Sequence, residues 1–329
     1  MKILIAGLGS IGRRHLRNLI TLGEKDIILY RSHRSTLPDD ELKEFSVETD
    51  LGEALAKDPQ AVIVANPTSL HLDVAIPAAQ AGCSILMEKP VSHSLKGTDQ
   101  LEKALRKHGG SFLAGFHFRY HPGLVQVREW LSEECIGKVV SIQSFWGEYL
   151  PGWHPWEDYK ISYAARADLG GGVVNTLSHP FDYLRWMFGE VQSLQALTSS
   201  DGLNLPVEDS ADILLKFRSG SIASIHLDYL RRPPRHTVEI IGTRGTITWD
   251  NANGSARCYD VEKNDWVQVT PPEGFERNHL FLAEMRHFLN VIRGEEQPHC
   301  SLEDGLAVIR ITQAVHKSAS RSALVELDH

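Results

Sequence analysis

In the first third of the chain, short apolar runs alternate with segments in which apolar residues recur at helical spacing. The run Lys2–Ala6 predicts a buried strand, and the positions after it predict a helix that stops at Gly23. The same alternation continues to residue 115. It predicts further strands at Ile27–Tyr30, Ala61–Ala65, Ser84–Met87 and Ser111–Gly115, and helices at Asp50–Ala56, Ser69–Ala81 and Leu95–His108. Strands separated by helices indicate a parallel, doubly wound sheet.

After about residue 118 the pattern becomes that of an α+β fold. It predicts a helix near Gly123–Leu131, a strand at Val139–Trp146, an aromatic loop through Tyr163 and a helix at Val173–Met187. Strands with alternating polarity follow between residues 191 and 269, at Asp212–Phe217, Ile222–Asp228, Thr237–Ile241 and Thr246–Trp249. Turn residues separate these strands, which favours a largely antiparallel open sheet.

The change of pattern and the length of 329 residues predict two domains, at residues 1–118 and 119–329. The fold class is therefore α/β in the first domain and α+β in the second. Two closing helices, near Leu280–Ile292 and Leu302–Ser318, either cover a face of the second sheet or return to the first domain. The sequence does not choose between these placements.

Composition and charge argue against several classes of partner. Hydrophobic residues make up 42% of the chain and charged residues 23%, as in ordinary globular proteins. A formal charge of −8 gives no global attraction to nucleic acid or anionic lipid, so we expect a small-molecule partner. The four cysteines are too far apart for a local zinc site or a disulfide framework, so we expect no metal and a reducing, cytoplasmic location. The apolar residues before Gly7 are too few for a signal peptide or a membrane span.

The turn after the first strand has the sequence GLGSIG. In this position the first glycine permits a tight turn, the second lets the backbone approach a pyrophosphate, and the third allows helix and strand to pack closely. The first domain is therefore predicted to be a Rossmann domain. Its predicted dinucleotide contacts in this turn are Gly7, Gly9, Ser10, Ile11 and Gly12.

The second predicted strand ends without the acidic residue that commonly binds the adenosine ribose. Arg31, Ser32 and Arg34 are found there instead. A guanidinium can bind a 2′-phosphate through two hydrogen bonds, so we expect NADP(H) to be preferred, with NAD(H) possible. The alternative is that these arginines are solvated loop charges.

Polar residues follow a third strand end. Asn66, Pro67 and Thr68 come directly after it, and His71 lies one helical turn further on. These residues are placed to face the nicotinamide half of a dinucleotide. The alternative is that Thr68 or Ser69 caps the following helix and that His71 is a surface histidine.

Glu88 and Lys89 follow the strand Ser84–Met87 and precede Pro90. Ligands of open parallel sheets bind at this edge. If Lys89 is buried beside a nucleotide, its pKa can be lowered and it can exchange a proton with a substrate hydroxyl. The alternative is an ordinary strand end with two solvated charges.

The order of GLGSIG, ANPTSLH, MEKP and GGGVVNTLSHPFDYLRW along the chain resembles the glucose-fructose oxidoreductase/inositol dehydrogenase (Gfo/Idh/MocA) family. The resemblance covers most of the chain. It implies NAD(P)-dependent oxidation or reduction of a sugar, a cyclitol or a nucleotide-linked sugar. It also implies that the second domain binds the substrate and forms a homodimer or homotetramer through its sheet.

By motif position, the resemblance implies that Lys89 and His179 handle the proton. Where the family commonly has aspartate, four residues before His179, this chain has Asn175. Residues four apart share a helix face, so Asn175 can still hydrogen-bond a substrate beside His179, but it cannot titrate. Pro180 removes a helical hydrogen bond and is expected to kink the segment. The glycines at 170–172 allow close approach either to a ligand or to a neighbouring chain segment.

The other substrate-binding candidates are aromatic or charged. In the family, the region of Trp153 and Arg166 borders the active site; a loop folded on its own aromatic residues is the alternative. Arg119 either grips an acidic substrate or forms a structural ion pair, and the sequence does not choose. Asp182 either orients the imidazole or pairs with Arg185 across the same helix.

Three functional hypotheses follow. In the first, nicotinamide exchanges a hydride with the substrate carbon, Lys89 or His179 exchanges the hydroxyl proton, and Lys89 stabilises the developing oxyanion. In the second, a tightly held cofactor supports redox-neutral glycoside hydrolysis or elimination. In the third, Asn175 and Pro180 mark a decayed site, and the protein is a non-catalytic NADP or sugar sensor.

Overall fold

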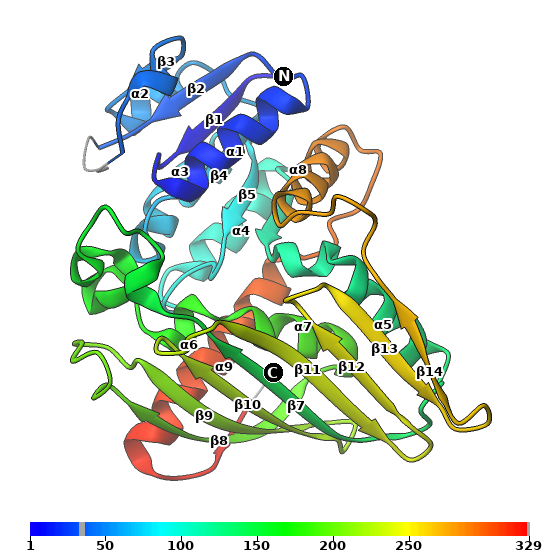
Figure 1. Cartoon of the computed structure of the whole chain (residues 1–329). Coiled ribbons are helices and arrows are strands. Elements are labelled where there is room, and N and C mark those ends of the chain that lie inside the picture. The colour runs from blue at the N-terminus through cyan, green and yellow to red at the C-terminus, as the bar shows by residue number, and fades with distance from the viewer. Residues whose placement is uncertain (33–36, 328–329) are drawn as a thin grey trace. The chain divides into compact units, whose positions relative to one another are not determined.

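The computed structural model describes residues 1–32 and 37–327 and divides into two compact units. Unit 1 contains residues 1–117, 168–170 and 277–309, and unit 2 contains residues 118–167, 171–276 and those from 310 onward. Each unit has its own β-sheet (Figure 1). The first closing helix belongs to unit 1, one of the two placements that the sequence left open. The division into a cofactor-binding domain up to residue 118 and a substrate-binding domain after it stays a prediction.

The sheet of unit 1 has six parallel strands in the order β3-β2-β1-β4-β5-β6. The strands are β1 (Ile3–Ala6), β2 (Ile27–Tyr30), β3 (Ser46–Glu48), β4 (Ala61–Val64), β5 (Ser84–Glu88) and β6 (Phe112–Gly115). β1, β4, β5 and β6 are buried along their whole length, as expected for apolar strands covered on both faces. The strand order reverses at β1 and β4, and ligands of doubly wound sheets bind at such a point.

The helices of unit 1 begin where local signals place them. They are α1 (Ser10–Thr21), α2 (Leu51–Leu55), α3 (His71–Gln80), α4 (Thr98–His108) and α8 (Asn278–Ile292), with short 3-10 turns at Asp40–Leu42 and Thr68–Leu70. The predicted cap of α2 is formed, because the Asp50 side chain accepts a hydrogen bond from Glu53 N at 2.9 Å. α4 begins later than predicted, because Gly97 takes a left-handed conformation at φ +85°. α8 packs against α1.

The sheet of unit 2 has nine strands in the order β14-β13-β12-β11-β7-β10-β9-β8-β15. They are β7 (Val139–Gly147), β8 (Val191–Ser199), β9 (Ser210–Phe217), β10 (Ile222–Asp228), β11 (Arg235–Gly242), β12 (Thr246–Asp250), β13 (Ser255–Asp260), β14 (Asp265–Val269) and β15 (Val325–Glu326). Only β7 and β10 pair in parallel; the other neighbours are antiparallel. The predicted fold class is confirmed for both units.

Helices cover one face of this sheet (Figure 1). They are α5 (Pro122–Ser132), α6 (Val173–Thr176), α7 (His179–Phe188) and the part of α9 (Leu302–Arg321) from residue 310 onward, and 3-10 turns lie at Leu150–Gly152, Tyr159–Ile161 and Tyr163–Ala165. α5 packs on β12 and β13, and α6 packs on β9 and β10. Residues of β9 alternate between buried and exposed, so the other face of the sheet is open. In the described part of the chain, no helix has the length and apolar character to cross a membrane.

One predicted helix is broken in two. The segment from Val173 forms α6, the backbone leaves helical geometry at Leu177 (φ −96°, ψ 40°), and α7 restarts at His179. Pro180 has no backbone N–H to donate to a carbonyl one turn earlier, but it fits in the first turn of a new helix. The segment is disrupted as expected, but the break lies at Leu177, before His179 and not after it, and the prediction of one continuous helix is wrong.

Candidate functional site

The glycine turn after β1 has the close approaches that a dinucleotide-binding turn requires. Gly7 has φ +95°, and a Cβ there would lie 2.5 Å from Asn66 N. A Cβ at Gly12 would lie 1.9 Å from Gly7 O, so only glycine lets α1 approach the end of β1. A Cβ at Gly9 would meet no atom within 4 Å, so there is open space beside this residue.

The first turn of α1, which contains Ser10 and Ile11, is open to a ligand. No side chain caps it and it contains no acidic residue. Its backbone N–H groups and the positive end of the helix dipole therefore favour an anion at this end. The turn, the space at Gly9 and the uncapped helix together fit a pyrophosphate.

Arg31 lies at the end of β2, and its guanidinium is already paired. Arg31 Nη1 lies 2.6 Å from Asp39 Oδ1. Arg31 is buried, whereas the Asp39 side chain is 53% exposed. The NADP(H) prediction did not consider a carboxylate partner for Arg31, and Asp39 is such a partner. Ser32 is exposed at the same strand end, and Arg34 lies outside the described residues.

The segment that carries Asp39 is tied to α1. The buried Arg13 side chain donates to Leu8 O at 3.0 Å and to Glu41 Oε1 at 2.9 Å, and Arg17 Nε donates to Glu41 Oε2 at 3.0 Å. Partial burial raises the pKa of Glu41, but the hydrogen bonds from Arg13 and Arg17 outweigh it and hold the pKa below its usual value. Glu41 therefore stays ionised in the segment that carries Asp39.

His71 connects the ends of β4 and β5. Its Nε2 lies 2.9 Å from Asn66 O and its Nδ1 lies 3.3 Å from Val91 O. The residue is 1% exposed, so the alternative of a surface histidine is wrong. Burial lowers the pKa of His71, and a neutral imidazole has a single N–H, so His71 donates a hydrogen bond to only one of these two carbonyl oxygens. His71 therefore positions the loop after β4.

Pro67 and Thr68 lead from this loop into α3. Thr68 is buried at the start of a 3-10 turn, and Asn66 Nδ2 donates to Leu70 O at 2.9 Å across that turn. α3 has no side-chain cap, so the alternative of a cap by Thr68 or Ser69 is wrong. The polar groups after β4 are instead fixed by Asn66 and His71.

Glu88 ends β5 and pairs with His15 of α1. His15 Nε2 lies 2.7 Å from Glu88 Oε1, and both residues are buried. Burial raises the pKa of Glu88, but the hydrogen bond and charge of His15, with the charge of Lys89, outweigh it and leave the pKa below its usual value. The pair ties the helix after the glycine turn to the strand end that carries Lys89. The sequence analysis missed His15, because its partner is 73 positions away.

Lys89 is half-buried after β5, and its backbone N–H donates to Glu88 Oε2 at 3.3 Å. A second imidazole, that of His117, lies two residues after β6 and stacks on Phe281 of α8 with 4.1 Å between ring centroids. Burial lowers the pKa of His117 well below its usual value, and the charges of Arg277 and Lys89 lower it further. A neutral histidine therefore accompanies the lysine. Its position just after a parallel strand is the signal that could have identified it.

Two glycines before α6 make room for other parts of unit 2. A Cβ at Gly171 would lie 2.4 Å from Tyr163 O, and a Cβ at Gly172 would lie 2.3 Å from Glu208 Oε1. Gly172 also has φ +99°. The sequence left open whether these glycines allow close approach to a ligand or to a neighbouring chain segment. For Gly171 and Gly172 the second explanation applies.

Asn175 and His179 lie on different helices, α6 and α7, so the shared helix face expected from their spacing does not form. Asn175 Nδ2 donates to Gly171 O at 3.3 Å. Its Oδ1 is buried and has no hydrogen-bond partner among the described residues. A buried acceptor without a partner is costly, and a ligand hydroxyl would satisfy it.

Aromatic rings fix the position of the His179 imidazole, which is 1% exposed. Its ring centroid lies 4.9 Å from that of Phe118, edge to face, and 5.6 Å from that of Trp146. One turn further along α7, Asp182 forms a buried ion pair with Arg119. A structural ion pair, one of the two alternatives for Arg119, is therefore formed, while a role in substrate binding stays a prediction.

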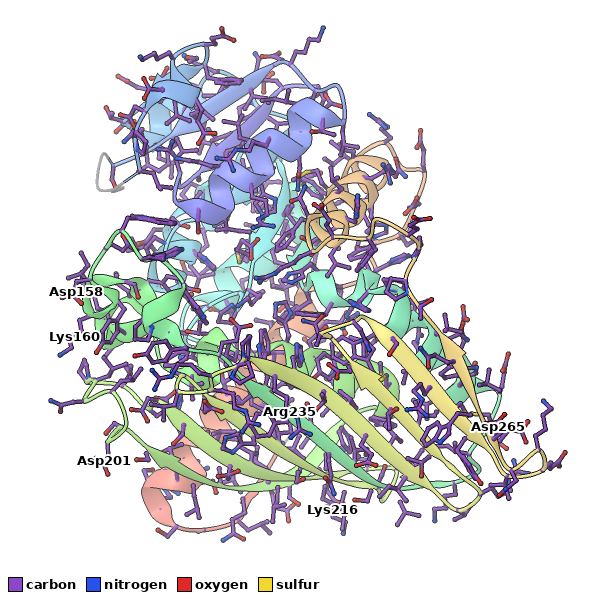
Figure 2. The ribbon with its side chains drawn as sticks, viewed as in Figure 1. Asp158, Lys160, Asp201, Lys216, Arg235 and Asp265 are labelled. Atoms are coloured by element: carbon purple, nitrogen blue, oxygen red, sulfur yellow. The ribbon has the colours of Figure 1, made fainter. Side chains whose placement is uncertain are left out.

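The loop between β7 and α6 contains the remaining candidates. The Trp153 ring contacts Tyr229 edge to face, with 5.8 Å between centroids. Trp153 Nε1 has no partner within the described part of the chain. Arg166 is half-buried. Asp158 and Lys160 lie at the outer surface of the loop (Figure 2).

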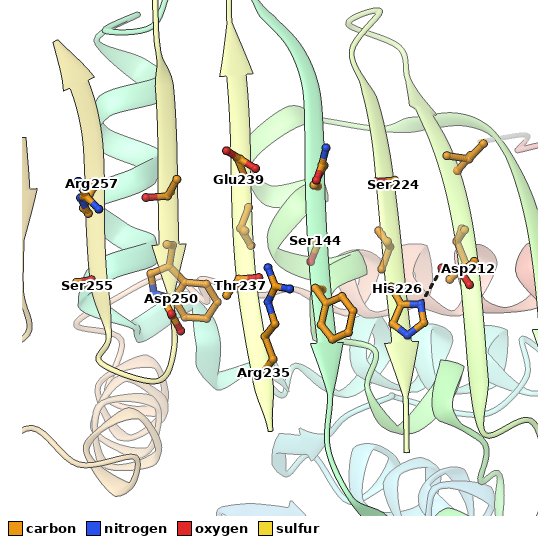
Figure 3. Close-up of a pocket in the computed structure, with 18 of the residues that line it drawn as sticks. Ser144, Asp212, Ser224, His226, Arg235, Thr237, Glu239, Asp250, Ser255 and Arg257 are labelled. Carbon is orange, nitrogen blue, oxygen red and sulfur yellow. Dashed lines mark hydrogen bonds and ion pairs between the residues drawn. The ribbon is translucent and has the colours of Figure 1, made fainter. Parts of the chain in front are cut away.

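The open face of the unit 2 sheet has a separate hollow of about 800 Å³ (Figure 3). Polar and charged side chains from several strands line it, among them Gln143, Asp212, His226, Arg235, Glu239 and Arg257. His226 stacks on Phe145 with 4.7 Å between centroids and hydrogen-bonds Asp212 at 2.7 Å. None of the residues predicted for the site lines this hollow.

One group of potential metal ligands occurs in the described part of the chain, formed by His287, Glu296 and His299. Both ring nitrogens of His287 already bond to protein groups. His287 Nδ1 pairs with Glu296 Oε2, and His287 Nε2 accepts the backbone N–H of His299 at 3.0 Å. Coordination by either nitrogen would break one of these bonds, so the group does not fit a preformed metal centre.

Comparison with known proteins agrees with this fold. Residues 1–116 match the model of an oxidoreductase family with an NAD-binding Rossmann fold, and residues 124–248 match that of the Gfo/Idh/MocA C-terminal domain. Myo-inositol 2-dehydrogenase from Thermotoga maritima is 28% identical, over 100% of this chain and 99% of the relative. D-xylose 1-dehydrogenase (NADP(+)) 2 from Haloferax volcanii is 25% identical, over 98% and 99%.

A structure of levoglucosan dehydrogenase in complex with NADH and levoglucosan has the same fold, with a TM-score of 0.88. The identity is 19%, and the match covers 100% of both chains. The two family models together span both units, and the curated relatives align over nearly the whole chain. This chain belongs to the Gfo/Idh/MocA family of oxidoreductases, with an NAD-binding Rossmann fold.

Proposed function

We propose that the protein transfers a hydride between a nicotinamide cofactor and a secondary alcohol or ketone of a sugar, a cyclitol or a nucleotide-linked sugar. The observation that carries this proposal is the end of β5. There the buried Glu88 is held by His15 of the glycine-turn helix, and Lys89 follows it directly. The names of the relatives support a sugar or cyclitol substrate.

Unit 1 would hold the cofactor. Gly7, Gly9 and Gly12, with the first turn of α1, would receive the pyrophosphate, because backbone N–H groups and open space meet there. The loop after β4, from Asn66 to Thr68 and fixed by His71, would lie toward the nicotinamide half. When bound, the nicotinamide supplies the hydride acceptor or donor.

Lys89 and His179 would handle the proton in this proposal. In oxidation, the Lys89 amine or the His179 imidazole takes the hydroxyl proton, and the lysine ammonium stabilises negative charge on the oxygen. His117 stays neutral beside Lys89, so it adds no positive charge there. Asn175 would hydrogen-bond a substrate hydroxyl through its unpartnered Oδ1.

The finer proposal for the cofactor is a preference for NADP(H), determined by Arg31. Its support is the position of this guanidinium at the end of β2 and an Nε without a partner among the described residues. Asp39 competes with a 2′-phosphate for the same guanidinium. The preference therefore depends on both residues.

The proposal is tested by following absorbance at 340 nm with both nicotinamide cofactors. The substrate panel includes myo-inositol, D-xylose, levoglucosan and nucleotide-linked sugars. We expect the oxidised cofactor to be reduced in the presence of at least one substrate. We expect Lys89→Met or His179→Ala to lower kcat by about two to four powers of ten. The exposed residues Lys96 and His108 provide the matched controls Lys96→Met and His108→Ala, which should retain full activity.

Two results would overturn parts of the proposal. Cofactor binding without turnover anywhere in the panel would refute the dehydrogenase and favour the sensor. Near-normal turnover in both Lys89→Met and His179→Ala would refute the assigned proton groups while leaving the dehydrogenase in place. Circular dichroism of each variant separates lost chemistry from lost folding.

A further inference from the structure

Two thiols that are far apart in the sequence meet inside unit 2. Cys135 Sγ and Cys258 Sγ lie 2.9 Å apart although 123 positions separate the residues. Cys258 is buried and Cys135 is half-buried, and both are free thiols. The sequence predicted no disulfide framework from the spacing of the cysteines, but spacing does not report which positions the fold brings together.

Cys135 is held by the end of α5. The N–H of Cys135 donates to Trp130 O at 3.1 Å, and the N–H of Glu134 donates to Leu131 O at 3.1 Å. Glu134 has φ +53° between them. These bonds form the Schellman motif, which fixes the backbone immediately after a helix. Cys135 is therefore placed by the hydrogen bonds that end α5.

Cys258 is held from the other side by the sheet. It lies within β13, opposite Ile247 of β12 and Val267 of β14. The turn that carries Cys135 is bonded to the hairpin between β11 and β12, because Arg244 N donates to Ile136 O at 2.9 Å. Both backbones are thus fixed, and the hairpin between β11 and β12 connects the turn that carries Cys135 to the sheet that carries Cys258.

The separation of the sulfurs is short enough for a bond to form with little movement. A disulfide has an S–S distance of about 2.05 Å, so the two atoms need to approach by only about 0.9 Å. We expect rotation of the two side chains to supply a shift of this size. Oxidation would therefore convert a contact already present into a covalent link.

We propose that Cys135 and Cys258 form a reversible oxidation site that joins the end of α5 to β13 when the protein meets a small disulfide such as oxidised glutathione. The half-buried Cys135 loses its proton, and its thiolate attacks a sulfur of glutathione disulfide. A mixed disulfide forms and one glutathione leaves as thiolate. The Cys258 thiolate then attacks the Cys135 sulfur, and the second glutathione leaves. Two protein thiols are oxidised and one glutathione disulfide is reduced to two glutathiones.

The reaction is slow at neutral pH. Burial and the neighbouring Cys258 thiol raise the pKa of Cys135 to about 12, and burial raises the pKa of Cys258. Only a small fraction of either thiol is ionised near pH 7, and the thiolate is the reactive form. The site therefore responds to sustained oxidation, and its rate rises roughly tenfold for each pH unit below the pKa of Cys135.

The link should stabilise the folded protein. It would close a loop of 123 positions, and long closed loops reduce the entropy of the unfolded chain most. The sulfurs are already adjacent, so the folded state should gain little strain. We expect the midpoint of thermal unfolding to rise by roughly 5 °C or more after oxidation.

The full chain is incubated with oxidised glutathione at pH 8.5, denatured and treated with N-ethylmaleimide. Mass spectrometry should show two maleimide adducts instead of four, loss of two hydrogen atoms, and a peptide pair that joins Cys135 to Cys258. Reduction should restore all four thiols. A variant with Cys83→Ser and Cys300→Ser should form the same link, whereas Cys258→Ser should retain one glutathione on Cys135.

Other results would overturn the proposal. Four reactive thiols in the oxidised wild-type protein would show that no bond forms. A link that includes Cys83 or Cys300 would show that the pair is not the reactive one. Glutathione that remains on Cys135 while Cys258 is present would show that the second exchange does not occur. These measurements on the wild-type chain do not depend on the folding of any variant or on enzymatic activity.

Discussion

Arg119 and Asp182 form a bidentate ion pair in the interior of unit 2. Arg119 Nη2 lies 2.7 Å from Asp182 Oδ1, and Arg119 Nε lies 3.0 Å from Asp182 Oδ2. Their side chains are 4% and 1% exposed. Asp182 lies one helical turn after His179 at the start of α7. The pair therefore fixes the helix end that carries the proposed catalytic imidazole.

Breaking this pair on one side should destabilise the protein strongly. In Arg119→Met, the Asp182 carboxylate remains buried without its cation, and we expect a loss of about 3–5 kcal/mol in the free energy of unfolding. The double variant Arg119→Met, Asp182→Leu should recover much of this loss, because no buried charge remains. Urea unfolding of the single and double variants measures the coupling. A stable Arg119→Met protein with a raised KM would instead support substrate binding by Arg119.

Two glycines of the same turn should separate folding from cofactor binding. A Cβ at Gly9 meets nothing within 4 Å, so Gly9→Ala should fold with a thermal midpoint within a few degrees of the wild type. The added methyl group would occupy the space proposed for the pyrophosphate, and we expect at least a tenfold loss in cofactor affinity. Gly12→Ala places a Cβ 1.9 Å from Gly7 O and should destabilise unit 1 itself. Cofactor affinity is measured by calorimetric titration. A Gly9→Ala protein that binds the cofactor as tightly as the wild type would contradict the proposed pyrophosphate position.

Much of this fold follows from periodicity, because burial leaves a direct signal in the sequence. β4 and β5 are covered on both faces and therefore appear as continuous apolar runs. β9 and β10 have one open face and therefore alternate. The edge strand β3 was missed, because it has three residues, two exposed and one half-buried, which give neither signal.

The side-chain partners at the site could not be predicted in the same way. Lys89 and Glu88 were found because they follow a strand at a ligand-binding edge. The partner of Glu88, His15, is 73 positions away, and no spacing rule joins residues that meet only after the sheet is assembled. The pairing of Arg31 with Asp39 was also missed, although the residues are near in sequence, because no helical or strand periodicity relates a strand end to the irregular segment after it; this pairing changes what the arginine can do.

Asp39 should tune the choice between the two cofactors. Arg31→Asp removes the proposed 2′-phosphate contact and should weaken NADPH binding about tenfold to a hundredfold, with a smaller effect on NADH. Asp39→Asn keeps the shape of the side chain but removes the competing charge, so NADPH should bind more tightly. Fluorescence titration with both cofactors gives the ratio of dissociation constants. Equal changes for NADPH and NADH in both variants would remove Arg31 as the selectivity residue.

His121 should make the protein sensitive to acid. Its Nδ1 accepts hydrogen bonds from Gly123 N at 3.0 Å and from Trp249 Nε1 at 3.3 Å, which requires an unprotonated Nδ1. Burial lowers the pKa of His121 from 6.5 to about 4. Between these values the unfolded chain binds a proton that the folded chain does not. Stability therefore falls as the pH drops from about 6.5 to about 4, by about 3 kcal/mol from this residue.

His121→Asn isolates this contribution, because asparagine can cap α5 through its side-chain oxygen without titrating. The free energy of unfolding is measured by urea titration for both proteins from pH 7.5 to pH 4. Over this range the free energy of unfolding of the wild type should fall by about 3 kcal/mol more than that of the variant. The effects of other titrating groups cancel in the difference. Parallel curves would mean that the folded protein tolerates a proton on His121, and that the two donors at Nδ1 do not hold the imidazole neutral.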